Sequence, residues 1–156
     1  MTQLLGPIQK RDILYGVKRP QQAELSKLAQ DFESEGWFSD ALDFSQQAGD
    51  KEKMKKLRDL ARDEGNTFLF LKSLRVLAES PDNNADLKKC AEVAEGLGKI
   101  RYAIMAFEKL GDLDRVENLK QKIANDLDIQ SELQSRTQVF IPEHAEELEG
   151  DGPEES

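Results

Sequence analysis

Apolar residues recur along the chain at the three- and four-residue spacing that places side chains on one face of an α-helix. One stripe comprises Leu25, Leu28, Ala29 and Phe32, and a second comprises Phe38, Ala41, Leu42, Ser45 and Ala48. The same alternation continues downstream, as far as the stripe of Ile100, Ala103, Ile104, Phe107 and Leu110. The pattern predicts seven helices, near residues 21–35, 38–48, 50–64, 67–79, 83–97, 99–110 and 112–134.

These stripes belong to a repeat. Gly36, Gly65 and Gly98 lie 29 and 33 residues apart. Five positions after them come Ala41, Phe70 and Ala103, and eight positions before them come Leu28, Leu57 and Cys90. A fixed period of this length is the signature of stacked helical hairpins, in which each unit buries its apolar face against its neighbours.

Turn residues agree with these boundaries. Gly49-Asp50 and Gly111-Asp112 each combine a residue that accepts positive φ with an acceptor side chain for capping the next helix. All five prolines lie outside the predicted helices. Helices of this length are marginal in isolation, so we expect them to be stabilised by stacking.

The units resemble the tetratricopeptide repeat (TPR) family between about residues 23 and 124. The matching positions of the first unit are Leu25, Leu28, Ala29, Phe32, Gly36, Ala41, Ser45 and Ala48, and those of the third are Leu87, Cys90, Ala91, Ala94, Gly98, Ala103, Phe107 and Leu110. Val116, Leu119 and Ile123 resemble the start of a capping helix. The resemblance implies an all-α fold, an α-α superhelix of about three helix-turn-helix repeats plus a C-terminal capping helix.

The middle unit departs from the family pattern. Arg58 replaces a small residue, Phe70 replaces an alanine, and the 29-residue interval is short of the family's usual period. We therefore expect an irregular junction between the first two units.

In the family, the first helices line a groove that binds peptides or partner helices. Carried over by position, the resemblance implies a partner-binding face formed by Gln30, Glu33, Lys55, Asp59, Arg62, Lys88 and Glu92. Asp59 stands where members that clamp a C-terminal carboxylate have an asparagine, which disfavours that ligand class.

Trp37 directly precedes the patterned Phe38 and is the single tryptophan. Because tryptophan is enriched among interface hot spots, one hypothesis is that Trp37 anchors a partner. The alternative is that it packs against the N-terminal segment.

Three regions are expected: an N-terminal extension (1–20) packing on the first repeat, a TPR-like domain (21–135), and an acidic tail (136–156) with a composition typical of disorder. The apolar residues 13–17 either cover the first repeat or dock a partner. Residues 139–142, Val-Phe-Ile-Pro, are either a short linear motif or a segment that folds back on the stack.

Charge and composition exclude several functions. The net charge of −9 resides in residues 126–156, whereas residues 1–125 are neutral, so no concentrated basic face favours nucleic acid. No apolar run is long enough to span a membrane, and the start of the chain lacks the apolar core of a signal peptide. The single cysteine fits a cytoplasmic location.

No catalytic, metal or cofactor motif is found. His144, the single histidine, lies in the acidic tail, and Cys90 occupies a repeated apolar position typical of a buried thiol. The sequence therefore predicts that the chain is not an enzyme, but an adaptor or scaffold that binds a partner protein or peptide through its helical surface. The alternative is a small regulatory or chaperone-like subunit that acts through its acidic tail.

Overall fold

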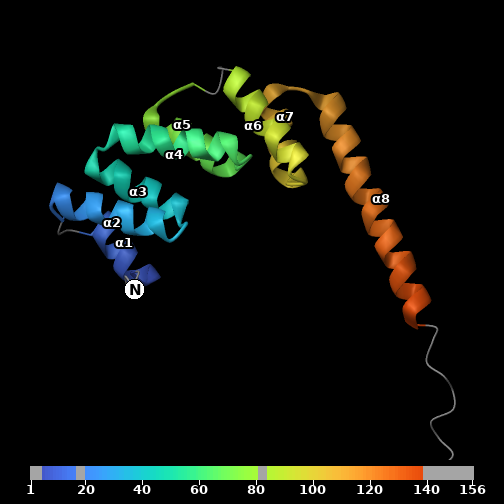
Figure 1. The fold of residues 1–156 in the computed structure, drawn as a ribbon, viewed down its shortest axis with the longest axis horizontal. Helices are drawn as coiled ribbons and strands as arrows, with labels where there is room; N and C mark the ends of the chain where they lie inside the picture. Colours follow the sequence, from blue (N-terminus) through green and yellow to red (C-terminus); the bar gives the residue numbers. More distant parts are fainter. Residues whose placement is uncertain (1–4, 17–19, 81–83, 139–156) are drawn as a thin grey trace, which may run out of the picture. The chain divides into compact units, whose positions relative to one another are not determined.

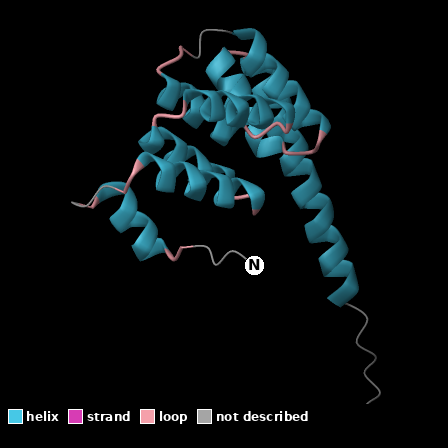
Figure 2. Cartoon of the chain, turned by 60° about the vertical axis from the view of Figure 1, so that its left-hand side comes forward, coloured by secondary structure: helices cyan, strands magenta, loops and turns pink. Residues whose placement is uncertain are grey.

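The computed structural model describes residues 5–16, 20–80 and 84–138, with residue 84 and residues 132–138 described as backbone only. These residues form eight α-helices and no strand (Figures 1 and 2). The helices are α1 (Pro7–Tyr15), α2 (Gln22–Ser34), α3 (Phe38–Ala48), α4 (Lys51–Asp63), α5 (Thr67–Leu77), α6 (Asn84–Gly96), α7 (Ile100–Leu110) and α8 (Leu113–Gln138). The fold is therefore all-helical, with packing between neighbouring helices.

The chain divides into two compact units, Met1–Leu119 and Lys120–Ser156. The first unit contains α1 to α7 and the first turns of α8, and it holds all of the buried core. The described part of the second unit is the remainder of α8, on which Leu127 and Ile129 are exposed.

The helix bounds agree closely with the hydrophobic pattern. Helices α2 to α7 begin and end within two residues of the predicted positions, and α8 continues to Gln138, beyond the predicted 134. The predicted aspartate caps are also confirmed: Asp50 accepts from the backbone N–H of Lys53 at 3.0 Å, and Asp112 from that of Arg115 at 3.2 Å. Helix α1 was not predicted, because a single buried residue, Leu14, produces no apolar stripe.

The core follows the repeat. Ala41, Phe70 and Ala103, five positions after the three glycines, are 0 to 1% exposed. Eight positions before the glycines, Leu57 and Cys90 are equally buried, whereas Leu28 of the first hairpin is only partly buried. In the first hairpin the rings of Phe32 and Phe44 stack with their centroids 5.2 Å apart. Stacked hairpins thus supply one continuous core cluster.

The turns also repeat. Gly36, Gly65 and Gly98 have positive φ between the two helices of each hairpin. Between hairpins, Gly49 and Gly111 have positive φ at the ends of α3 and α7. Ala78 occupies the corresponding position after α5, with φ of 54°. A side chain there is strained by the clash of Cβ with the backbone, so the second unit departs from the other two.

The two junctions between hairpins differ. Helix α6 packs against both α4 and α5, whereas α2 and α4, both fully described, have no pair of Cα atoms within 8 Å. At the second junction, a Cβ added to Gly65 would lie 2.6 Å from the backbone of Ala94, so these backbones are in close contact. At the first junction the two first helices therefore stand apart, whereas at the second they pack directly against each other.

Candidate functional site

The first helices of the hairpins, α2, α4 and α6, carry the seven positions that the family resemblance implied. Gln30 and Glu33 on α2 both meet Lys53 on α4: its ammonium donates to Gln30 Oε1 at 2.6 Å and lies 2.9 Å from Glu33 Oε2. Two of the seven residues are therefore engaged in bridging the first hairpin to the second.

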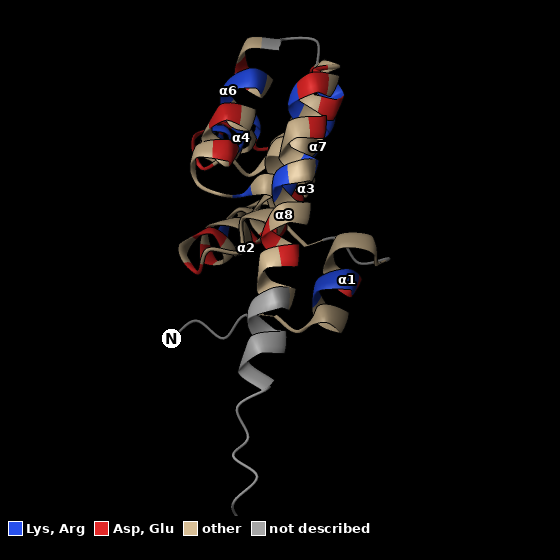
Figure 3. Ribbon diagram, turned by 90° about the vertical axis from the view of Figure 1, so that its right-hand side faces the viewer, with Lys and Arg blue, Asp and Glu red and all other residues tan. Residues whose placement is uncertain are grey.

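Arg62 is the centre of a larger network on the same face. Its guanidinium lies 3.5 Å from Asp59, 3.0 Å from Asp63 and 3.2 Å from Asp86 on α6. Asp63 also accepts from Lys89 on α6 at 2.9 Å. The pKa of Asp63 is lowered to about 2, chiefly by the hydrogen bond from Arg62 and next by the hydrogen bond from Lys89. Figure 3 shows acidic and basic residues distributed along α4 and α6, which this network joins.

The remaining three predicted positions are not brought together with this network. Among the residues that the structure describes, Lys55 pairs with Glu52 of its own helix alone, and Lys88 and Glu92 on α6 are exposed. No large apolar residue described on α2, α4 or α6 is exposed. The face formed by these helices therefore offers a ligand mainly charged and polar side chains, several of which are already paired within the chain.

The eighth predicted residue, Trp37, lies elsewhere and is 57% exposed. It precedes α3 and lines a shallow groove of about 330 Å³ at the N-terminal ends of α3, α5 and α7. Phe68 on α5, 53% exposed, and the half-buried Tyr102 on α7 also line this groove. We call it the aromatic groove; its other lining residues are Gly36, Phe38, Ser39, Asp40, Asn66 and Leu69.

The backbone that carries these rings is fixed. The N–H of Trp37 donates to the carbonyl of Phe32 at 2.8 Å, while the carbonyl of Trp37 accepts from the N–H of Ala41 at 3.0 Å. On the opposite side, the buried hydroxyl of Thr67 donates to the carbonyl of Tyr102 at 2.8 Å and so ties α5 to α7. The backbone at Trp37 and Tyr102 is thus held by hydrogen bonds, which reduces the conformational entropy lost when a ligand binds.

The polar side chains at the edge of the aromatic groove are already paired. Asp40 forms an ion pair with Lys10 on α1. Ser39 Oγ accepts from Lys72 at 2.8 Å, and Asn66 caps α5 by accepting from the N–H of Leu69 at 3.1 Å. With these groups satisfied, the aromatic rings dominate what the groove offers, and it suits an apolar side chain.

Trp37 was found from the sequence, but Phe68 and Tyr102 were not. The available signal was a position in the repeat: three residues after the glycine, the first and third units have Ser39 and Arg101, whereas the second has Phe68. An aromatic residue at an outward position where the other two units have polar residues indicates a surface role.

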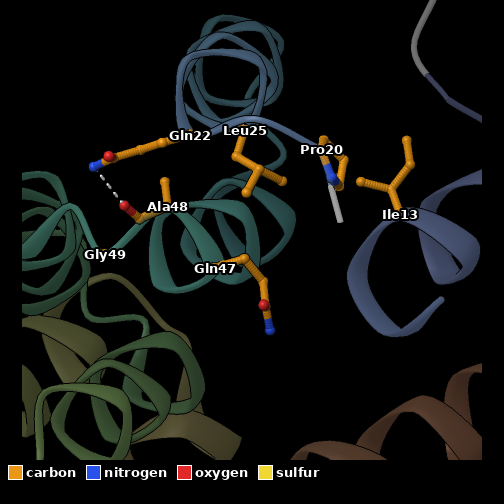
Figure 4. Close-up of a pocket in the computed structure, with 7 residues that line it drawn as sticks. All are labelled: Ile13, Pro20, Gln22, Leu25, Gln47, Ala48 and Gly49. Atoms are coloured by element: carbon orange, nitrogen blue, oxygen red, sulfur yellow. Dashed lines mark hydrogen bonds between the residues drawn. The ribbon is translucent and has the colours of Figure 1, made fainter. Parts of the chain in front are cut away.

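A second groove lies between α1, α2 and α3 and has a volume of about 320 Å³ (Figure 4). Ile13, Pro20 and Leu25 line it, and Gln22 donates to the carbonyl of Ala48 at 2.9 Å. Of the apolar residues at 13–17, Ile13 packs against the core and Leu14 is buried, while Tyr15 is 75% exposed. Residues 17–19 lie outside the described residues.

Reactive groups are few in the described part of the chain. Cys90 is fully buried beside Thr67, and burial raises the pKa of its thiol, which keeps it protonated. No cluster of three or more His, Cys, Asp or Glu residues that could hold a metal ion occurs in residues 5–16, 20–80 and 84–138. His144 and the segment 139–142 lie outside these ranges.

No helix in the described residues is sufficiently long and apolar to cross a membrane. Comparison with protein-family models, curated proteins and solved structures finds no match to this chain.

Proposed function

We propose that this protein is an adaptor that binds a partner protein or peptide through the aromatic groove of its helical stack. The observation that supports the proposal is that Trp37 and Phe68, 57% and 53% exposed, line the same groove, whose polar side chains are paired within the chain. Exposed aromatic side chains on a fixed backbone are typical anchors of protein interfaces.

We also propose that α2 to α7 are three TPR-like repeats and that α8 begins as a capping helix. The equivalence of the three buried alanine and phenylalanine positions supports this assignment. In contrast to the arrangement implied by the family, the partner surface is then at the ends of the second helices. A reducing cytoplasm is the proposed location, since the single cysteine is buried and unpaired.

The test is capture of partners from cell extract by Trp37→Ala and Phe68→Ala, compared with the unchanged protein. Truncating a hot-spot aromatic residue costs about 2 kcal/mol or more, so we expect retention of the partner to fall by about thirtyfold or more. Both side chains are more than half exposed, so the thermal unfolding midpoint should stay close to that of the unchanged protein.

Tyr15→Ala is the matched control, because Tyr15 is a still more exposed aromatic residue, on α1. Equal retention by all three variants contradicts a role for the aromatic groove.

Removal of residues 137–156 tests the alternative function, in which the protein acts through its acidic tail. If this deletion abolishes capture while Trp37→Ala leaves it unchanged, the protein acts through its acidic tail.

A further inference from the structure

The outward faces of α3, α5 and α7 can be aligned through the repeat. Ser39, Phe68 and Arg101 stand three residues after their glycines, and Asp43, Lys72 and Met105 stand seven after. The structure supports this alignment between α3 and α5, where Lys72 lies 2.7 Å from Asp43 and donates to Ser39 Oγ at 2.8 Å. Helix α5 in turn packs against α7. The three helices therefore present their outward positions side by side.

Basic groups without a partner lie on two of these helices. Arg75 on α5 and Arg101 and Lys109 on α7 are exposed, and none of them has an ion pair or side-chain hydrogen bond among the described residues. Helix α5 contains no acidic residue, and Glu108 is the single acidic residue of α7. The carboxylates of Asp40 and Asp43 on α3 are each paired with a lysine of the same chain. Glu35, in the turn before α3, is exposed and also has no ion pair among the described residues, so the positive charge without a partner is confined to the outward faces of α5 and α7.

Apolar side chains lie among these cations. Phe68 is two helical turns before Arg75 on the same face of α5, and Met105, 36% exposed, stands between Arg101 and Lys109 on α7. Arg101 directly precedes Tyr102, which lines the aromatic groove. Helices α5 and α7, whose N-terminal ends line the groove, thus also carry exposed apolar side chains and unpaired cations.

We propose that this surface binds an acidic peptide segment whose apolar side chain enters the aromatic groove between Trp37 and Phe68, while its carboxylates pair with Arg101 and Arg75. The inference rests on the proposed adaptor function and adds the chemistry of the partner. Guanidinium groups bind carboxylates in a two-pronged geometry, so two unpaired arginines on the helices that line the groove favour acidic over basic flanks. Three cations on a chain of net charge −9 are too few for a nucleic-acid backbone.

The test uses three fluorescein-labelled peptides that share a Phe-x-x-Leu anchor and differ only in flanks of glutamate, glutamine or lysine. Fluorescence anisotropy measures their affinity for the full chain at low and high NaCl. We expect the glutamate peptide to bind about tenfold more tightly than the glutamine peptide at low salt, with the difference shrinking at high salt. The lysine peptide should bind most weakly.

Two charge-reversed double variants sharpen the assignment. Arg75→Glu with Arg101→Glu should remove the preference for glutamate, because it reverses the charge beside the groove. Lys27→Glu with Lys56→Glu changes the net charge equally at exposed lysines of α2 and α4 and should leave the preference intact. Circular dichroism should show all variants folded, since the replaced side chains are exposed.

The outcomes separate the two proposals. If all three peptides bind equally and lose affinity in Trp37→Ala, the acidic specificity is wrong while the groove stands. If the glutamate peptide binds but Trp37→Ala has no effect, the groove itself is wrong. Equal binding of a labelled DNA oligonucleotide, a dimer formed by the free protein, or tighter peptide binding after removal of residues 143–156 would each identify another occupant and overturn the inference.

Discussion

At the scale of single residues, Gly65 has the most restricted environment of the turn glycines. Its φ of 62° is disfavoured for side chains, and an added Cβ would lie 2.6 Å from the Cα and N of Ala94. Gly36, the equivalent residue of the first hairpin, also has positive φ, but nothing lies within 4 Å of its added Cβ. Alanine substitutions at Gly65 and Gly36 therefore separate the cost of backbone strain from the cost of close contact between hairpins.

We predict that Gly65→Ala lowers the free energy of unfolding more than Gly36→Ala does. Strain from positive φ costs about 1–2 kcal/mol at either position. At Gly65 the overlap with α6 adds about 1–3 kcal/mol, because the backbone of Ala94 has to move. Urea denaturation of both variants measures the difference. Equal losses would mean that the backbones of Gly65 and Ala94 are not in contact.

At the scale of elements, the helices were predictable because each of α2 to α7 buries a full stripe, and the spacing of a stripe is visible in the sequence. Helix α1 was not, since only Leu14 is buried on it. The ion pairs of α2, α4 and α6 were also hidden: Glu33 and Lys53 meet only through the packing of two hairpins. The sequence located those helices without revealing the ion pairs between their side chains.

The aromatic groove was only partly predictable, for a similar reason. Trp37 was recognisable as the single tryptophan next to a patterned residue. Phe68 and Tyr102 join it only because the N-terminal ends of three helices from different hairpins meet at this groove. That relation depends on packing between hairpins, which spacing within one helix does not specify.

The pairing of α4 with α6 gives a prediction about pH. Asp63, with a pKa lowered to about 2, is charged in the folded state and is held by Arg62 and Lys89. Because its folded pKa lies below the ordinary value, its contribution to stability is complete above about pH 4 and is lost as the pH falls towards 2. We predict that Lys89→Gln raises the pKa of Asp63 towards its ordinary value and weakens this dependence.

NMR titration of the Asp63 carboxyl carbon measures this shift. Lys88→Gln removes the same charge at the neighbouring exposed residue and should leave the titration unchanged. A similar shift in both variants would show a general effect of net charge in place of the specific contact between Asp63 and Lys89.

At the scale of the whole first unit, stability should depend on junctions of different kinds. In stacked repeats, stability is approximately a sum of hairpin and junction contributions, and hairpins can open separately. The first junction is bridged by Lys53 to Glu33 and by Lys72 to Asp43. The second has ion pairs from Arg62 to Asp86 and from Lys89 to Asp63, and in addition backbone contact at Gly65 and a buried hydrogen bond from Thr67 to the carbonyl of Tyr102. Loss of the two lysines that bridge the first junction should therefore loosen that junction and leave the second intact.

We predict that Lys53→Gln with Lys72→Gln accelerates hydrogen exchange in α2 and α3 by about fivefold while α4 to α7 stay protected. Partly buried ion pairs of this kind contribute up to about 1 kcal/mol together, and that energy opposes opening of the first hairpin. Lys55→Gln with Lys56→Gln removes the same charge from α4 without touching another hairpin and should change little. Protection that falls evenly over α2 to α7 would mean that the stack opens as one cooperative unit, with no separable first hairpin.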